Sequence, residues 1–257
     1  MFNFISNWLE RRIIQRSEIT GQQWRRAFDS LPLLTGFNNH DKQTLKELAI
    51  LFLHRKSFEG AQGVVVTQAM ALIIALQACL LILKLDLRGF SGWYSVIVYP
   101  SAFVTKRVVT DEAGVEHVVR SNLVGEAWQN GPVVLAWDDP ENAGIIDGNN
   151  LVVHEFAHKL DMQNGVANGF PPLHAGMDST TWVEDFSEGY KDFQKKCETG
   201  VDIGINCYAA SAPAEFFAVF SELFFERPEL IVKHYNNIYS QLKIYYRQDP
   251  LQRLAAT

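Results

Sequence analysis

The spacing of apolar residues predicts a largely helical chain. Between residues 41 and 55 the apolar positions are Leu45, Leu48, Ala49, Phe52 and Leu53. This is the i, i+3, i+4, i+7, i+8 spacing of a helix that buries one face. Comparable spacing or helix-start signals predict further helices at residues 1–16, 24–31, 178–197, 212–226 and 238–248, and another that begins at Pro228.

One segment is apolar on every side. Residues 61–83 carry no charged side chain, and their number reaches the roughly 20 residues that a membrane-spanning helix needs. Gln62, Gln68 and Gln77 would be costly in lipid. We therefore expect residues 67–84 to form a helix enclosed in the protein core and no membrane span, with a spanning helix as the alternative.

Residues 93–137 have the pattern of strands instead. Residues 94–99 predict a strand that Pro100 ends, residues 103–109 and 115–120 predict a hairpin, and residues 133–137 predict a last strand. The fold class that follows is α+β, mostly helical with a small mixed sheet. We expect a single unit over residues 1–257, with a helical part at 1–90, the sheet at 91–140 and a second helical part at 149–257.

Charge and cysteine content narrow the function classes. The net charge is −6 and no basic stripe is present, which argues against direct binding of nucleic acid. Cys79, Cys197 and Cys207 are odd in number and form no C-x-x-C pair, which predicts reduced thiols and a cytoplasmic location. The first residues lack the pattern of a secretory signal peptide.

The strongest chemical signal is an H-E-x-x-H motif, which begins at His154 and ends at His158. Residues four apart lie on the same face of a helix, so the two imidazoles can bind one metal ion. Glu155 stands where such sites carry the general base that acts on water. Two surface histidines on an amphipathic helix are the alternative interpretation.

A catalytic zinc needs a third protein ligand. No histidine follows His158 at the spacing of a metzincin. The candidates further along the chain are His174, Asp178, Glu184, Glu188, Glu215 and Glu222. We choose Glu215, because Ser211 can cap a helix there and Pro213 suits its first turn. An ordinary first-turn glutamate is the alternative.

Several segments together resemble one known family. They are residues 98–100, 131–137, 154–161, 207–211, 214–219 and 248–254. The chain resembles the Mlc titration factor A family over nearly its whole length. Its second half also looks like the zinc protease domain of anthrax lethal factor, which has a His-Glu-Phe-x-His helix and a later ligand glutamate.

The resemblance implies a zincin-like zinc metallopeptidase with aminopeptidase-type activity. It implies one Zn²⁺ per chain with His154, His158 and Glu215 as ligands, Glu155 as the base, and Tyr208 over the scissile carbonyl. It further implies binding to the glucose-responsive repressor Mlc. A regulatory binding protein with a structural or vestigial zinc is the alternative function.

One departure from lethal factor leaves a role open. Lethal factor has an acidic residue four positions after its ligand glutamate, whereas this chain has Val219. Ligating histidines usually donate their second N–H to a carboxylate or carbonyl. The first candidate for that partner is Asp161, on the helix face of the two histidines, and the second is Glu222. His174 and the acidic loop at residues 138–141 are further candidates for contact with substrate.

Overall fold

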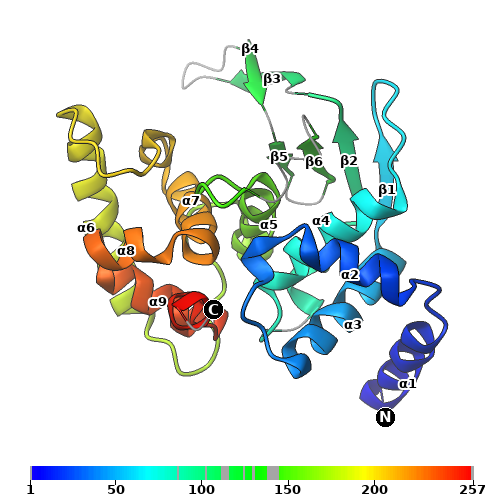
Figure 1. The fold of residues 1–257 in the computed structure, drawn as a ribbon. Coiled ribbons are helices and arrows are strands. Elements are labelled where there is room, and N and C mark those ends of the chain that lie inside the picture. Colours follow the sequence, from blue (N-terminus) through cyan, green and yellow to red (C-terminus); the bar gives the residue numbers. More distant parts are fainter. Residues whose placement is uncertain are drawn as a thin grey trace.

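The computed structural model describes residues 2–85, 87–101, 103–110, 116–123, 125–128, 131–137 and 145–255. The helices in these residues are α1 (Phe2–Gln15), α2 (Gly21–Asp29), α3 (Asn39–Arg55), α4 (Gln68–Leu81), α5 (Leu151–Asp161), α6 (Ser179–Glu198), α7 (Pro213–Glu226), α8 (Pro228–His234), α9 (Asn236–Tyr246) and α10 (Pro250–Ala255) (Figure 1). The strands are β1 (Ser57–Gly60), β2 (Ser95–Tyr99), β3 (Phe103–Thr110), β4 (Glu116–Leu123), β5 (Gly125–Ala127) and β6 (Val133–Ala136).

The helices expected from apolar spacing are all present, and their ends differ from the prediction by a few residues at most. Local capping explains several starts. The side chain of Asn38 accepts a hydrogen bond from the Asp41 backbone N–H at 2.9 Å, which satisfies a first-turn donor of α3. Helix α10 was not predicted. Its six residues are too few for an apolar period to stand out.

Helix α4 is the uncharged segment, and the prediction of a core helix is confirmed. It packs between α3 and α5, and the residues of its second half are buried, Gln77 among them. Gln77 is tolerated in the core because its side-chain oxygen accepts a hydrogen bond from the Asn150 side chain at 2.8 Å. No helix in the described part of the chain is both long and apolar enough to cross a membrane.

A mixed sheet of four strands lies beside the helices in the order β1-β2-β6-β5. Strands β1, β2 and β6 are parallel, and β5 pairs antiparallel with β6. Val96 lies opposite Val133 in the register of β2 and β6, and both are fully buried. The expected range of 91–140 for the sheet was too narrow, because β1 comes from residues 57–60. That short strand is mostly exposed and has no clear alternation to predict it.

Strands β3 and β4 form a separate antiparallel hairpin, with Phe103 opposite Leu123 and Thr110 opposite Glu116. The predicted hairpin is therefore confirmed. The loop expected to close it, at residues 111–114, lies outside the described residues.

Helix α5 lies at the centre of the fold. Figure 1 shows the sheet above it, α4 on one side and α7 on the other. The ring of Phe156 packs against Phe52, Phe90 and Trp93 at centroid distances of 5.6, 5.1 and 5.7 Å. Such aromatic pairs add about 0.5–1.5 kcal/mol each beyond the burial of their area. This cluster therefore holds α5 rigidly against the first half of the chain.

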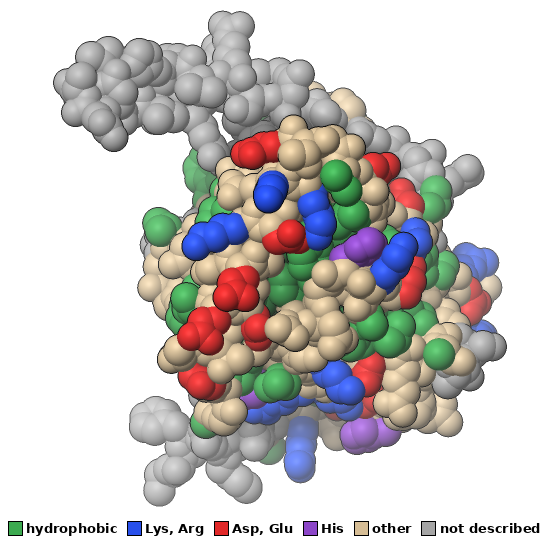
Figure 2. Space-filling model, turned by 90° about the vertical axis from the view of Figure 1, so that its left-hand side faces the viewer, with side chains coloured by type: hydrophobic (Ala, Val, Ile, Leu, Met, Phe, Trp, Pro, Cys, Tyr) green, Lys and Arg blue, Asp and Glu red, His purple; other side chains and the backbone are tan. Residues whose placement is uncertain are grey.

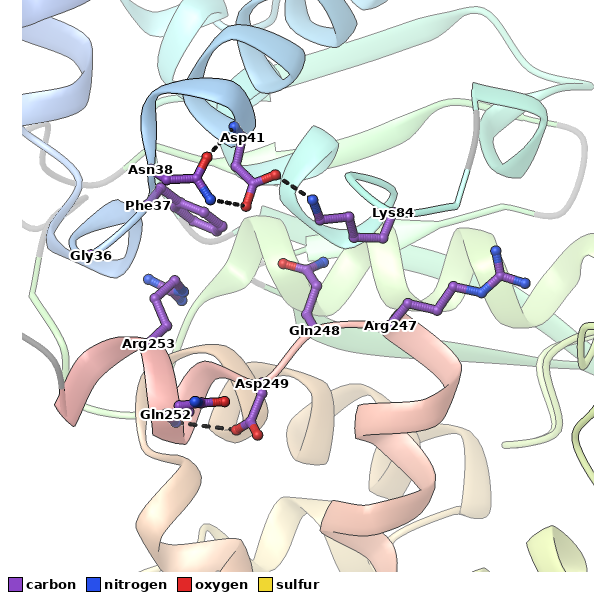
Figure 3. Close-up of a pocket in the computed structure, with 10 residues that line it drawn as sticks. All are labelled: Gly36, Phe37, Asn38, Asp41, Lys84, Arg247, Gln248, Asp249, Gln252 and Arg253. Atoms are coloured by element: carbon purple, nitrogen blue, oxygen red, sulfur yellow. Dashed lines mark hydrogen bonds and ion pairs between the residues drawn. The ribbon is translucent and has the colours of Figure 1, made fainter.

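The C-terminal helix α10 is attached to the N-terminal half beside a pocket of about 430 Å³ (Figure 3). Nη1 of Arg253 donates hydrogen bonds to the backbone oxygens of Leu33 and Thr35 at 2.7 and 2.5 Å. Its guanidinium also lies 4.3 Å from the centre of the Phe37 ring. Arg253 thus holds α10 against residues 33–37 in the N-terminal half.

The face of the molecule beyond α6 carries mixed charge. Figure 2 shows acidic and basic side chains distributed over this face, between apolar and polar ones. The side chains coloured there form no continuous basic surface, in keeping with the net charge of −6. A nucleic-acid backbone would need such a surface.

Candidate metal centre

Helix α5 supplies two imidazoles. The Asn150 side chain caps the helix by accepting a hydrogen bond from the Val153 backbone N–H at 3.0 Å. His154 and His158 follow one turn apart on the same face, with ring centroids separated by 4.8 Å. Both are buried. The motif is therefore helical, as expected, and its histidines are not the surface pair of the alternative interpretation.

Helix α7 supplies a carboxylate. It begins at Pro213 and packs against α5, so Glu215 in its first turn points towards the two imidazoles. The prediction that Ser211 caps this helix is wrong. Ala212 occupies the capping position, and the Ser211 hydroxyl instead donates to the Tyr208 backbone oxygen at 2.7 Å. Proline at the start and the packing of the helix suffice to define it.

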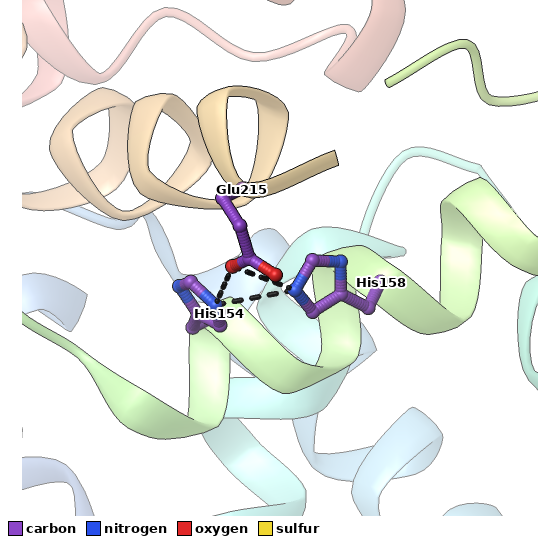
Figure 4. A group of neighbouring side chains, drawn as sticks. All are labelled: His154, His158 and Glu215. Carbon is purple, nitrogen blue, oxygen red and sulfur yellow. Dashed lines mark hydrogen bonds and ion pairs between the residues drawn. The ribbon is translucent and has the colours of Figure 1, made fainter. Parts of the chain in front are cut away.

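Three atoms converge on one point (Figure 4). Nε2 of His154 lies 3.0 Å from Oε2 of Glu215 and 3.2 Å from Nε2 of His158, and the latter lies 3.3 Å from the same carboxylate oxygen. Donor atoms bound to one zinc at about 2.0–2.1 Å in a tetrahedral arrangement are about 3.3 Å apart. The spacing of the three atoms therefore fits a zinc-sized ion.

The charges around His154 favour a cation at this point. Burial acts to lower the pKa of His154, but the hydrogen bonds to Glu215 and Glu222 outweigh burial and raise that pKa to about 10. Hydrogen bonds from the two histidines likewise outweigh burial at Glu215 and lower its pKa. The carboxylates thus bind positive charge strongly, and a metal ion supplies it in place of a proton.

The second N–H of His154 has a carboxylate partner. His154 Nδ1 lies 2.7 Å from Oε1 of Glu222, and because a carboxylate only accepts, Nδ1 carries the proton and Nε2 presents its lone pair to the centre. Asp161, the first candidate for this role, is wrong. Its Oδ2 accepts from the backbone N–H groups of Asn168 and Gly169 at 2.8 and 2.7 Å. Those donors in the loop after α5 need an acceptor.

Asn150 links Glu222 to Glu226, and neither Asn150 nor Glu226 was expected beside the centre from the sequence. The backbone N–H of Asn150 donates to Glu222 Oε2, and the Asn150 side-chain amide donates to Oε1 of Glu226 at 2.8 Å. Glu226 is buried, and its burial raises the pKa to about 7. Glu215, Glu222 and Glu226 are seven and four residues apart, so they lie on one face of α7. That spacing was the signal available in the sequence.

Glu155 is buried beside the centre, with a relative exposure of 4%. Its Oε2 has no hydrogen-bond partner among the described residues. Burial raises its pKa, the two histidines partly offset this, and the result is a pKa of about 7. A carboxylate with this pKa exchanges a proton readily near neutral pH.

Tyr208 lies beside the centre and is partly exposed. It belongs to the 3₁₀ helix η5 (Cys207–Ala210), its ring centroid is 6.1 Å from that of His154, and 48% of its surface is exposed. The tyrosine is therefore close enough to contact a molecule bound over the imidazoles, and solvent reaches it.

A disulfide bond holds the helix that carries Tyr208. Cys207 is bonded to Cys197 at the end of α6, and Cys79 is free and buried. The expectation that all three cysteines are reduced thiols is therefore wrong. The two cysteines are only ten residues apart, and the turn between α6 and η5 brings their Cα atoms to 5.8 Å, within the range of disulfides.

The other residues weighed as ligands lie elsewhere. His174 Nε2 is 2.9 Å from the Ile244 backbone oxygen, and Asp178 caps α6 by accepting from the Thr180 backbone N–H at 2.8 Å. Glu184 and Glu188 are exposed on α6. The acidic loop at residues 138–141 lies outside the described part of the chain.

The comparisons with known proteins agree on one family. Residues 5–247 match the glucose-regulated metallopeptidase family M90. The chain is 38% identical over 250 residues to the Mlc titration factor A of Yersinia enterocolitica, covering 96% of this chain and 92% of the relative. It is 37% identical, with the same coverage, to the Mlc titration factor A of Yersinia pestis.

Proposed function

Because the chain belongs to the glucose-regulated metallopeptidase family M90, we propose that it is a zinc-dependent peptidase of the aminopeptidase type. The observation that carries this proposal is the convergence of His154, His158 and Glu215 within 3.3 Å of one another. We also propose that residues 1–257 act as one zincin-like unit. One continuous core cluster, which runs from Trp24 to Tyr246, supports this.

The donor set supports zinc as the metal. Two imidazole nitrogens and one carboxylate oxygen suit Zn²⁺, whereas Mg²⁺ and Ca²⁺ prefer oxygen donors throughout. Zinc, when bound, lowers the pKa of a water towards about 7 and polarises a carbonyl group. The hydrogen bond to Glu222 orients His154 and strengthens it as a donor.

Glu155 and Tyr208 supply the remaining chemistry. Glu155, with a pKa of about 7, accepts a proton from the attacking water and delivers it to the leaving amine. The Tyr208 hydroxyl donates a hydrogen bond to the scissile carbonyl oxygen as negative charge develops on it. Its distance from His154 and its exposure agree with this role.

A purely structural zinc site is the competing function. Structural sites are usually closed by four protein ligands and have no use for a general base. The group found among the described residues has three donors, and a buried carboxylate without a hydrogen-bond partner lies beside it. Both features favour the enzyme.

We expect the peptidase activity to depend on zinc. Chelation should abolish hydrolysis of amino-acid anilides, because no other group in the proposed mechanism lowers the pKa of the attacking water. One equivalent of Zn²⁺ should restore the activity. The rate is measured together with the metal content of each sample. Full activity in metal-free protein, or no hydrolysis of anilides or a peptide library by the zinc-loaded protein, contradicts the proposal.

Replacing Tyr208 with phenylalanine should lower kcat about tenfold or more, because one hydrogen bond to the developing oxyanion is lost. Zinc content should not change, since the tyrosine is not among the three converging donors. The control is Tyr94→Phe, which alters an exposed tyrosine before β2. An unchanged kcat for the Tyr208 variant assigns this residue to packing.

A regulatory role is proposed beside the enzymatic one. The relatives are named for titration of Mlc, and identity of 38% over 96% of the chain supports a shared partner. We therefore propose that the chain also binds an Mlc-type transcriptional repressor, which would place it in the cytoplasm. The contact is with the repressor protein, because the chain has a net charge of −6 and no basic stripe.

A further inference from the structure

Lys159 directly follows His158 on α5 and is almost completely buried, with a relative exposure of 3%. A buried ammonium group is costly unless its hydrogen bonds are satisfied. Its partners here are backbone oxygens. Nζ of Lys159 donates to the oxygen of Trp128 and, at 2.9 Å, to that of Gly131. It also lies 5.0 Å from the centre of the Trp93 ring.

These two oxygens belong to the connection between β5 and β6. Trp128 follows β5 directly, and Gly131 comes two residues before β6. Trp128 and Gly131 are themselves joined, because the Gly131 backbone N–H donates to the Trp128 oxygen at 3.1 Å. A Cβ atom on Gly131 would come within 2.9 Å of the Trp128 side chain. Lys159 therefore attaches Trp128 and Gly131, which flank β5 and β6, to the helix that carries the two imidazoles.

Strand β5 is the last strand of the four-stranded sheet. Within the described residues no strand pairs with its outer edge, and the strand packs on α5 (Figure 1). The main-chain groups of such an edge can bind an extended peptide. Strand β6 is not available in this way, because it is enclosed between β2 and β5.

We propose that Lys159 is a positioning residue that holds the β5 edge beside the metal centre, so that extended peptides bind there through their main chain. This inference rests on the proposed peptidase function and adds a substrate class, peptides long enough to reach β5. Successive helix positions point about 100° apart. One turn of α5 therefore presents His158 to Glu215 and Lys159 to the sheet.

Lys56 provides a matched control. Its Nζ also donates to two backbone oxygens, those of Phe90 and Trp93, both at 2.5 Å. It also lies over the Trp93 ring, 3.6 Å from the centre. It differs from Lys159 in its partners, which precede β2 and are not part of the β5–β6 connection. Loss of either ammonium group should therefore destabilise the protein to a similar extent.

The test compares a hexapeptide with an alanine anilide, whose single residue offers no extended main chain to pair with a strand. We expect Lys159→Met to raise KM for the hexapeptide about tenfold, because the loss of one or two main-chain hydrogen bonds has an effect of this size. For the anilide, kcat and KM should each change less than about twofold. Lys159→Arg, whose guanidinium can donate to two oxygens, should restore most of the hexapeptide KM. Lys56→Met should leave both KM values unchanged.

A binding measurement separates this inference from the proposed function. The affinity of a fluorescent hexapeptide is measured on the zinc-loaded Glu155→Gln variant, which needs no turnover, with and without Lys159→Met. About tenfold weaker binding in the double variant supports the inference even if the wild type hydrolyses nothing. The inference is overturned if Lys159→Met and Lys56→Met change KM for the hexapeptide equally, or if Lys159→Met changes KM for the hexapeptide and the anilide equally. It is also overturned if the zinc-loaded Glu155→Gln variant binds no peptide.

Discussion

Replacing Glu155 with glutamine is expected to lower kcat at least about a hundredfold while zinc stays bound, because a general base contributes about 10²–10⁴-fold and glutamine cannot accept the proton. The side chain is not one of the three converging donors, so the metal content should equal that of the wild type. The measurement is anilide hydrolysis beside metal analysis. Glu188→Gln, the same change at an exposed position on α6, is the control. Retained turnover in the metal-replete Glu155 variant removes Glu155 from the role of base.

Glu155 also determines how kcat/KM is expected to depend on pH. The pKa of Glu155 is raised to about 7, and the base works only when ionised. The wild-type kcat/KM should therefore fall as the pH drops below about 7. A bound cation favours the carboxylate and moves this fall to somewhat lower pH. The residual kcat/KM of the Glu155→Gln variant should not show this fall at low pH. The pH profiles of kcat/KM for the two proteins are compared.

The Glu155→Gln variant also separates the two proposed functions. Glutamine has nearly the same shape as glutamate and the metal is expected to stay bound, so the variant should bind an Mlc-type repressor with the same affinity as the wild type. Binding is measured by titration of a labelled repressor with each protein. Loss of binding together with hydrolysis would mean that the repressor contacts the catalytic centre itself, and binding by neither protein rules out the repressor as a partner.

Replacing Glu215 with glutamine is expected to weaken zinc binding by more than about a hundredfold, because changes to residues that only support a ligand already cost about 10–100-fold. Oε2 of Glu215 lies within 3.3 Å of both imidazole nitrogens, and its negative charge is lost in the variant. Turnover should disappear with the metal. Zinc content after dialysis and the zinc-induced rise in the thermal unfolding midpoint are measured, since a ligand that binds the native state stabilises it.

The control for this variant is Glu184→Gln, because Glu184 was also weighed as a ligand and is exposed on α6. It should bind zinc as the wild type does. Stoichiometric, tightly held zinc in the Glu215 variant would show that the third donor is another residue.

Most of the helices could be predicted, because a helix has a signal in its own local sequence. An apolar period marked α3, and an uncharged run marked α4. Strands with little local signal were missed. Strand β1 is mostly exposed, β5 has three residues, and both are defined by the neighbours with which they pair.

The hydrogen-bond partners of the metal centre likewise depend on contacts between segments that are distant in the sequence. Asp161 and Glu222 were both candidates, and the sequence favoured Asp161 because it lies on the same helix face as the two histidines. The structure joins Glu222 to His154 over 68 residues, and the backbone of the following loop takes up Asp161 instead. Spacing along one helix does not reveal which neighbouring segment lies against it.

By itself the sequence determined that one helix presents two imidazoles and an adjacent carboxylate, since the geometry of a single helical turn depends only on spacing. The sequence also favoured Glu215 among six candidate ligands, and the structure brings this residue to the imidazoles. The tertiary structure alone decided that Glu222 orients one imidazole, that Cys197 is bonded to Cys207, and that Lys159 contacts the ends of β5 and β6. Each of these contacts depends on how separate elements pack against one another. Packing is determined by the whole core, so no local sequence pattern predicts such a contact.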